Sequence, residues 1–67
     1  MFNRDLFRSK IIAAGKAIKD AAAVMGCNEA TLYRKMAGES DFTRNEIQLF
    51  KQAFGLTSQE IEDIFFA

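Results

Sequence analysis

The sequence of 67 residues predicts an all-α fold, a compact bundle of five short helices in a single domain spanning residues 1–67. Glycines stand where helices would end, capping motifs stand where they would begin, and apolar residues recur at helical spacing between them. No segment alternates apolar and polar residues for long enough to indicate a strand. The expected helices cover about 3–14, 18–25, 29–37, 44–54 and 58–66.

The starts of four helices are marked by side chains that can cap them. In two cases a Thr is followed three residues later by a Glu, the spacing of a capping box, and in the other two the cap is an Asn. The four caps are Asn3, Asn28, Thr43 and Thr57. The helix at 18–25 is the exception, because Ala17 at its cap position has no side-chain acceptor. Relative to Ser or Thr this costs about 1 kcal/mol, so we expect that start to fray more readily.

Glycines and apolar stripes complete the prediction of the bundle. A glycine just past a helix takes the left-handed conformation without a Cβ penalty. The four candidates are Gly15, Gly26, Gly38 and Gly55. Apolar residues at helical spacing predict the core. They are Phe7, Ile11, Ala14, Ile18, Ala21, Ala22, Met25, Leu32, Met36, Ile47, Phe50, Phe54, Ile61, Ile64 and Phe65.

The composition gives little support to catalysis. The chain has no His, so the usual general base near neutral pH is missing, and one Cys without His does not build a common zinc site. Cys27 is expected to be a small buried hydrophobe, and Glu60 and Asp63 a solvated pair. We therefore expect no enzyme, cofactor, metal or small-molecule substrate. No apolar run suits a signal core or a membrane span, so the expectation is a cytoplasmic protein without membrane contact.

Charge is distributed unevenly although the net charge is zero. Residues 1–38 carry seven cations and three anions, a balance of +4, whereas residues 39–67 carry two cations and six anions, a balance of −4. A basic half of this kind would orient the molecule toward phosphates. An uneven split by chance in a short sequence is the alternative interpretation.

The segments 18–25 and 29–37, joined at Gly26, have the layout of a DNA-reading helix-turn-helix. The first two turns of the second helix would then meet base edges in the major groove. The base-contact candidates are Asn28, Glu29, Ala30, Thr31 and Arg34. Arg34 is the strongest of them, because a guanidinium fork matches guanine O6 and N7 and contributes roughly 1–3 kcal/mol of discrimination.

Phosphate contacts are expected from the cations near this unit and from one aromatic hydroxyl. The candidates are Lys10, Lys16, Lys19, Tyr33, Lys35 and Arg44, together with Ser40 in the turn after the helix at 29–37. For any single Lys a purely solvating role is at least as good an interpretation. Tyr33 is equally suited to packing over the helix at 44–54.

The segment resembles the helix-turn-helix of the lambda-repressor-like, Cro-type phage regulators. The resemblance lies in a small residue within the first helix (Ala22), the turn Gly26, an aliphatic residue in the second helix (Leu32) and the closing Gly38. It implies base contacts at Glu29, Ala30 and Arg34. It also implies backbone contacts at Ala17, at Ile18 and from Ala37 to Ser40, and a symmetric homodimer on a palindromic operator.

The chain also departs from the pattern of that family. Ala17 and Ile18 stand where polar, phosphate-binding residues are usual, and Ala37 stands where an Asn is common. These departures leave fewer phosphate anchors, so an isolated monomer is expected to bind weakly.

The function predicted from these observations is that of a sequence-specific regulator of transcription, a phage or prophage repressor or Cro-type protein that binds double-stranded operator DNA. The alternative is a helical protein-protein interaction module that kept the fold. Zero net charge and the apolar end Ile64-Phe65-Phe66 favour it. In a third interpretation Phe65 and Phe66 only cover the core.

Overall fold

The structure of this chain is a computed structural model, and it describes residues 1–66. These residues form five helices and no strand, so the predicted all-α bundle is confirmed. The helices are α1 (Arg4–Ala13), α2 (Ile18–Met25), α3 (Glu29–Met36), α4 (Arg44–Phe54) and α5 (Ser58–Phe65). Each begins and ends within one residue of its expected bounds. Within the described part of the chain, no helix combines the length and apolar character needed to cross a bilayer.

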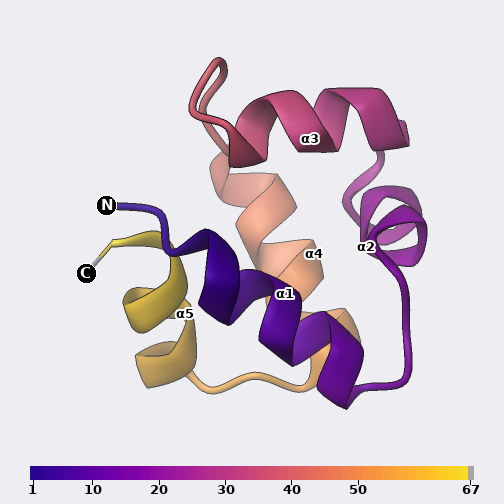
Figure 1. Cartoon of the computed structure of the whole chain (residues 1–67). Helices are drawn as coiled ribbons and strands as arrows, with labels where there is room; N and C mark the ends of the chain where they lie inside the picture. The colour runs from indigo at the N-terminus through magenta and orange to yellow at the C-terminus, as the bar shows by residue number, and fades with distance from the viewer. Residues whose placement is uncertain (67) are drawn as a thin grey trace.

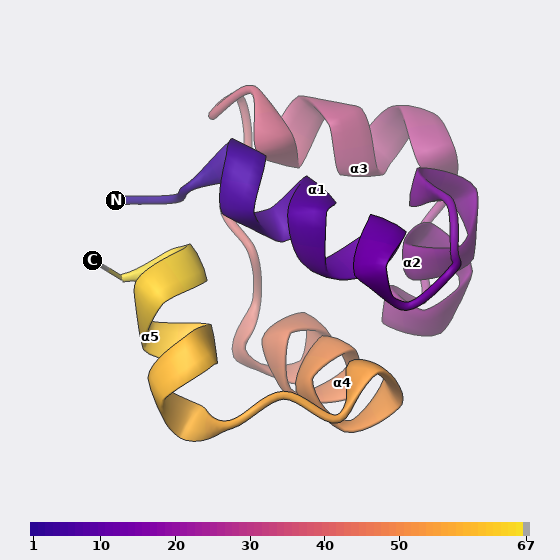
Figure 2. The same cartoon turned by 60° about the horizontal axis from the view of Figure 1, so that its bottom comes forward.

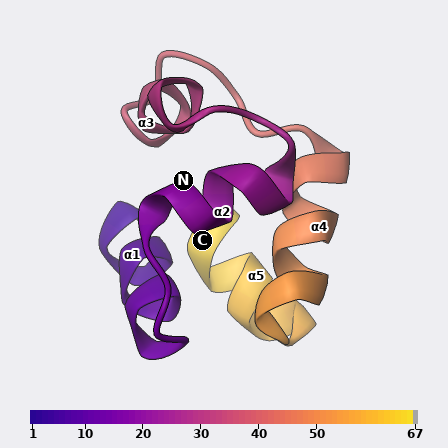
Figure 3. The same ribbon diagram turned by 90° about the vertical axis from the view of Figure 1, so that its right-hand side faces the viewer.

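The helices enclose one core, and α3 lies across the top of the bundle in Figure 1. α1 lies beside α5, and α2 packs on α4 and α1 (Figure 2). α3 rests chiefly on α2 and runs across it, since Figure 1 looks along α2 while α3 lies in the plane of the view. Figure 3 looks along α3 instead. The segment before α1 lies beside the end of α5, where the Asn3 amide donates to the Ile64 carbonyl at 2.6 Å.

Local hydrogen bonds fix the helix starts. Each of the four predicted caps accepts from the amide three residues later, at 2.7–3.1 Å. In α4 and α5 the Glu three residues after the cap also accepts from the cap's own amide, at 2.8 and 2.9 Å, which completes the capping box. Ala17 offers α2 no side-chain acceptor, as predicted, but the Asp20 carboxylate accepts from the Ala17 amide at 2.8 Å. The start of α2 therefore has half of a capping box.

Aromatic rings fill the centre of the core. Phe7 and Phe50 are fully buried, and their rings stack with centroids 4.7 Å apart. Phe65 meets Phe7 edge to face at 6.0 Å, and Phe2 packs on Phe42 at 4.8 Å. Such pairs contribute about 0.5–1.5 kcal/mol each beyond the area that they bury. They join the N-terminal segment, α1, the loop before α4, α4 and α5 into one unit.

The remaining predicted core residues are buried or half-buried, with one exception. Ala14 was expected in the buried stripe of the first helix, but it is exposed. α1 ends at Ala13, and the Ala14 amide donates to the carbonyls of Lys10 and Ile11 in a tightened last turn. Gly15 then turns the chain at a φ of 73°. The helical stripe stops with the helix, so spacing from Ile11 does not bury Ala14.

An ion pair joins α1 to α5 at the surface. Lys10 Nζ donates to Glu60 Oε2 at 2.7 Å, and Glu60 Oε1 accepts from the Thr57 amide at 2.9 Å. The hydrogen bond from Lys10, followed by that from the Thr57 amide, lowers the pKa of the Glu60 carboxyl to about 2. The Lys10 amine, a predicted phosphate contact, is thus engaged with α5.

Acid is expected to weaken the fold through Glu60. Because its pKa is lower in the folded chain, the stabilisation is present above about pH 4.5 and is lost as the pH falls toward about 2. The melting temperature of Glu60→Gln is therefore expected to fall less than that of wild type between these pH values, as measured by circular dichroism. Glu62→Gln, an exposed neighbour on α5, is the control and should behave as the wild type does. The same acid response in wild type and Glu60→Gln would contradict the prediction.

Candidate nucleic-acid interface

A turn of three residues joins α2 to α3. α2 ends at Gly26, whose φ of 78° lies in the left-handed region, and the Cys27 amide donates to the Ala22 carbonyl at 3.0 Å. Asn28 then caps α3 by accepting from the Thr31 amide at 2.7 Å. The space around Gly26 is open, so a Cβ would meet no neighbour, and the backbone conformation alone makes glycine necessary there. These bonds set the angle at which α3 leaves α2.

Cys27 is half-buried in this turn and packs against the core. Burial, and secondarily the Glu46 carboxylate, raise the pKa of its thiol, while the Lys35 ammonium opposes the rise. A thiol with a raised pKa forms less of the reactive thiolate. Its surroundings are therefore those of a small hydrophobic side chain.

α3 has a buried face and an exposed face. Leu32 and Met36 are buried in the core. On the other side Ala30, Tyr33 and Arg34 are exposed, and Tyr33 keeps 49% of its surface accessible. Residues three and four apart on a helix are neighbours, so these side chains form one stripe. Because α3 lies at the outside of the bundle (Figures 1 and 2), a ligand can reach this stripe.

The five predicted base-contact residues differ in access. Glu29, Ala30 and Arg34 are exposed, and α3 brings them together on the outer side of its first two turns. Asn28 is also exposed, but its Oδ1 already accepts the capping hydrogen bond. Thr31 is half-buried, so its side chain is less accessible than the other four.

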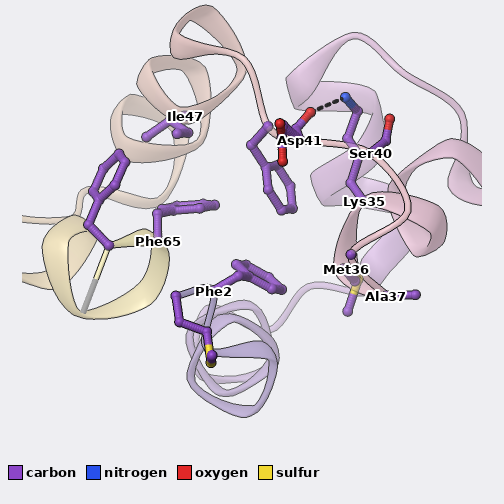
Figure 4. Close-up of a pocket in the computed structure, with 12 residues that line it drawn as sticks. Phe2, Lys35, Met36, Ala37, Ser40, Asp41, Ile47 and Phe65 are labelled. Carbon is purple, nitrogen blue, oxygen red and sulfur yellow. Dashed lines mark hydrogen bonds between the residues drawn. The ribbon is translucent and has the colours of Figure 1, made fainter.

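Lys35 lies inside the fold, whereas the sequence prediction places it at a phosphate. Its side chain is only 9% exposed, and Nζ lies 3.2 Å from Glu46 Oε1. Nζ also donates to the Asp41 carbonyl at 2.9 Å, the bond drawn dashed in Figure 4. The burial of Lys35 could have been predicted from its position three residues after Leu32 and next to Met36, which places it on the buried side of α3. A buried Lys needs such partners, and they cannot be identified from helical spacing.

Glu46 is held as a carboxylate although it is largely covered. Burial disfavours the charged form and acts to raise its pKa, but the Thr43 amide and the Lys35 ammonium outweigh burial, and the pKa lies below its usual value. One carboxylate therefore caps α4 and neutralises the buried amine of α3. This double role ties the C-terminal end of α3 to the start of α4.

The seven predicted phosphate-contact residues fall into two groups. Two of them, Lys10 and Lys35, are engaged in ion pairs with acidic side chains of the second half of the chain. The other five are exposed: Lys16, Lys19, Tyr33, Ser40 and Arg44. Three cations of the predicted set, on three separate segments, are thus left facing solvent.

Asp20 is a residue of this surface that was not predicted from the sequence. The resemblance implies a backbone contact with DNA at Ala17, but the Ala17 amide already donates to the Asp20 carboxylate. A phosphate approaching there would meet a negative charge at short range. This role could have been predicted from the position of Asp20, the third residue of the helix, where a carboxylate can accept from the cap amide. Ala17 lacks the side chain that would complete the capping box.

No family model, curated protein or solved structure matches this chain. Within residues 1–66 no group of His, Cys, Asp and Glu is placed to hold a metal ion. The chemistry available at this surface is hydrogen bonding from Arg34, Glu29 and Tyr33, and charge attraction from the neighbouring cations.

Removing the Lys35 amine is expected to destabilise the chain by about 2–3 kcal/mol, because it leaves the Glu46 carboxylate covered without its partner. The variants are Lys35→Met, Glu46→Gln and the double variant, compared by urea unfolding. The free energy of unfolding of the double variant should exceed the value predicted by adding the two single losses, by about 1 kcal/mol or more. Strict additivity would show that the 3.2 Å contact contributes no coupling.

Proposed function

We propose that this chain is a sequence-specific DNA-binding regulator of transcription that resembles the lambda-repressor-like, Cro-type phage proteins. Its α2–turn–α3 unit would act as a helix-turn-helix, with α3 in the major groove of double-stranded operator DNA. The observation that supports this most is the exposed stripe of Ala30, Tyr33 and Arg34 on a helix whose opposite face is in the core. A recognition helix needs this division between a packed face and an exposed one.

The residues of the stripe suit direct reading of bases. Arg34 offers a bidentate donor pair for guanine O6 and N7. Ala30, one turn earlier, presents a methyl group that suits the methyl of thymine, and Glu29 can accept from the amino group of cytosine. Short side chains at 30 and 37 let the helix approach the base edges on either side of Arg34. Binding rather than catalysis is the function that these side chains support.

Phosphate attraction is expected from Lys16, Lys19 and Arg44, with hydrogen bonds from Tyr33 and Ser40. In this proposal Lys10 and Lys35 make no phosphate contact, because acidic partners hold their amines. Each phosphate neutralised by a cation adds about −0.9 to the slope of log affinity against log salt. Three contacts per copy therefore predict a slope of about −3, and five would give about −4.5.

The test is a titration of this chain against duplexes selected from a random pool, repeated at several salt concentrations. We expect tighter binding to selected than to random duplex and a slope of about −3 per bound copy. Affinity that is independent of salt, or equal for selected and random duplexes, would overturn the proposed function. A slope near −4.5 would return Lys10 and Lys35 to the contact set.

Arg34→Ala is expected to relax base preference more than Lys19→Ala does. Loss of a bidentate guanine contact should cost roughly 1–3 kcal/mol at one position of the site. Loss of a phosphate contact should instead weaken binding to all sequences and reduce the salt slope by about 1. Competition binding with a panel of single-base variants separates the two patterns. Equal, uniform losses from both variants would remove the readout role of Arg34.

A specific observation favours a second candidate, a protein-interaction module. Phe66 is 59% exposed at the end of α5, whereas its neighbour Phe65 is buried in the core. Two fold-internal ion pairs also reduce the positive charge available for phosphates. If no duplex is selected from the pool, while size-exclusion chromatography shows a complex with another protein, this second function stands instead.

A further inference from the structure

We infer that Lys35 and Glu46 are positioning residues for the reading of bases by α3, an inference that rests on the proposed function. Neither side chain is available to a ligand, because they keep only 9% and 14% of their surface exposed and pair with each other at 3.2 Å. We call these two side chains and the Asp41 carbonyl the Lys35 clamp. The clamp would set the direction of α3, and with it the place at which Arg34 meets a base.

The Lys35 clamp is one of two attachments of α3 to the rest of the bundle. At its start, α3 is held by the turn at Gly26 and by packing on α2. At its end, Lys35 Nζ donates to the Asp41 carbonyl at 2.9 Å and lies 3.2 Å from Glu46 Oε1. Met36 packs into the core there as well, but apolar packing is non-directional and leaves a wider range of helix directions open. Without the clamp, the last turn of α3 would gain freedom to pivot about the turn at Gly26.

The clamp also closes the segment 37–43 that follows α3. At the beginning of this segment, the Glu39 amide donates to the Arg34 carbonyl at 3.0 Å. Further along, the Lys35 ammonium holds the Asp41 carbonyl, and Figure 4 shows this bond joining the segment to α3. The backbone of Arg34, the strongest candidate for base reading, is therefore part of a unit that the clamp completes.

Reading of a base by a guanidinium tolerates little displacement. Two parallel hydrogen bonds to guanine O6 and N7 require Arg34 to lie in a fixed direction relative to the base. Groups of a binding site need to be held within about 0.5 Å of their working positions, by side chains that packing and hydrogen bonds lock in place. Attraction to phosphates depends mainly on charge and tolerates larger shifts. Loss of the clamp should therefore reduce discrimination between bases more than general affinity for DNA.

The experiment measures the affinity of Lys35→Met and of Glu46→Gln, each in the whole chain, for the selected duplex, its single-base variants and random duplex. Each variant is expected to lose about tenfold in discrimination at the base read by Arg34, while its affinity for random duplex stays nearly the same. The two substitutions change the net charge in opposite directions. A loss that they share is therefore not an effect of charge on attraction to phosphates.

Glu60→Gln is the matched control. Glu60, like Glu46, is the third residue of its helix, accepts from the amide of a capping Thr and pairs with a Lys, but its pair joins α1 to α5. Breaking that pair should leave discrimination between bases unchanged. Equal losses of discrimination in Glu60→Gln and Glu46→Gln would show that general weakening of the fold is the cause, and would overturn the proposal.

The double variant of Lys35→Met and Glu46→Gln tests whether the two side chains act as one device. Lys35→Met already breaks the link from α3 to Asp41 and Glu46, so the second substitution has no further link to remove. Discrimination in the double variant should therefore equal that of Lys35→Met. Losses that add, or a return to the discrimination of wild type, would each overturn the clamp.

Amide hydrogen exchange without DNA tests the position of α3 independently of the proposed function. The amides of Ala37, Gly38 and Glu39 donate to carbonyls near the end of α3. In the double variant their exchange is expected to accelerate at least about tenfold more than that of amides within α5, because the opening is local. Equal acceleration in both places would overturn the positioning of α3. A wild type that selects no duplex would instead overturn the proposed function, and the reading of bases with it.

Discussion

One buried amine, that of Lys35, fixes the C-terminal end of α3 in this small bundle. α3 packs chiefly on α2, and at its far end Lys35 reaches inward to the Glu46 carboxylate and the Asp41 carbonyl. A charge with so little exposure is tolerated only when its hydrogen-bonding capacity is met, because desolvation would otherwise cost several kcal/mol. The pair therefore fixes where the C-terminal end of α3 lies, and losing one partner is costly because the other stays covered and unpaired. Any ligand that reads the outer stripe of α3 depends on an ion pair on the inner side of the same helix.

Local features of the fold could be predicted from the sequence, and distant ones could not. The caps at Asn28 and Thr43 and the turn at Gly26 each depend on residues within about four positions, so their physics is contained in a short window. The ion pairs of Lys35 and Lys10 join residues 11 and 50 positions apart, and helical spacing says nothing about which acid meets which base. For the candidate site, the exposure of Arg34 and Ala30 followed from the stripe. The ion pairs that remove Lys10 and Lys35 from the set of phosphate contacts did not follow from helical spacing.

The uneven charge of the two halves is thus partly an internal feature of the fold. Glu46 and Glu60, both from the acidic half, form ion pairs with Lys35 and Lys10 of the basic half. These opposite charges therefore join helices within the fold. Asp20 adds an anion at the start of α2, where the resemblance implies a backbone contact with a phosphate. The electrostatic case for DNA is therefore weaker in the folded chain than in the sequence, while the geometric case, the exposed face of α3, is unchanged. On the proposed function, base contacts would therefore have to supply a larger share of the affinity than nonspecific attraction to phosphates does.

This balance gives a physical reason for association between copies. On the proposed function, the three exposed cations near α3 gain little from phosphates at physiological salt, because the counterion release that drives each contact weakens as the salt concentration rises. Joining two such chains makes the second binding event intramolecular, and the effective concentration of the second copy can raise overall affinity about a hundredfold or more without any new contact to DNA. On the proposed function, a contact between copies would act on DNA binding through geometry, because it would set the distance between the two α3 helices.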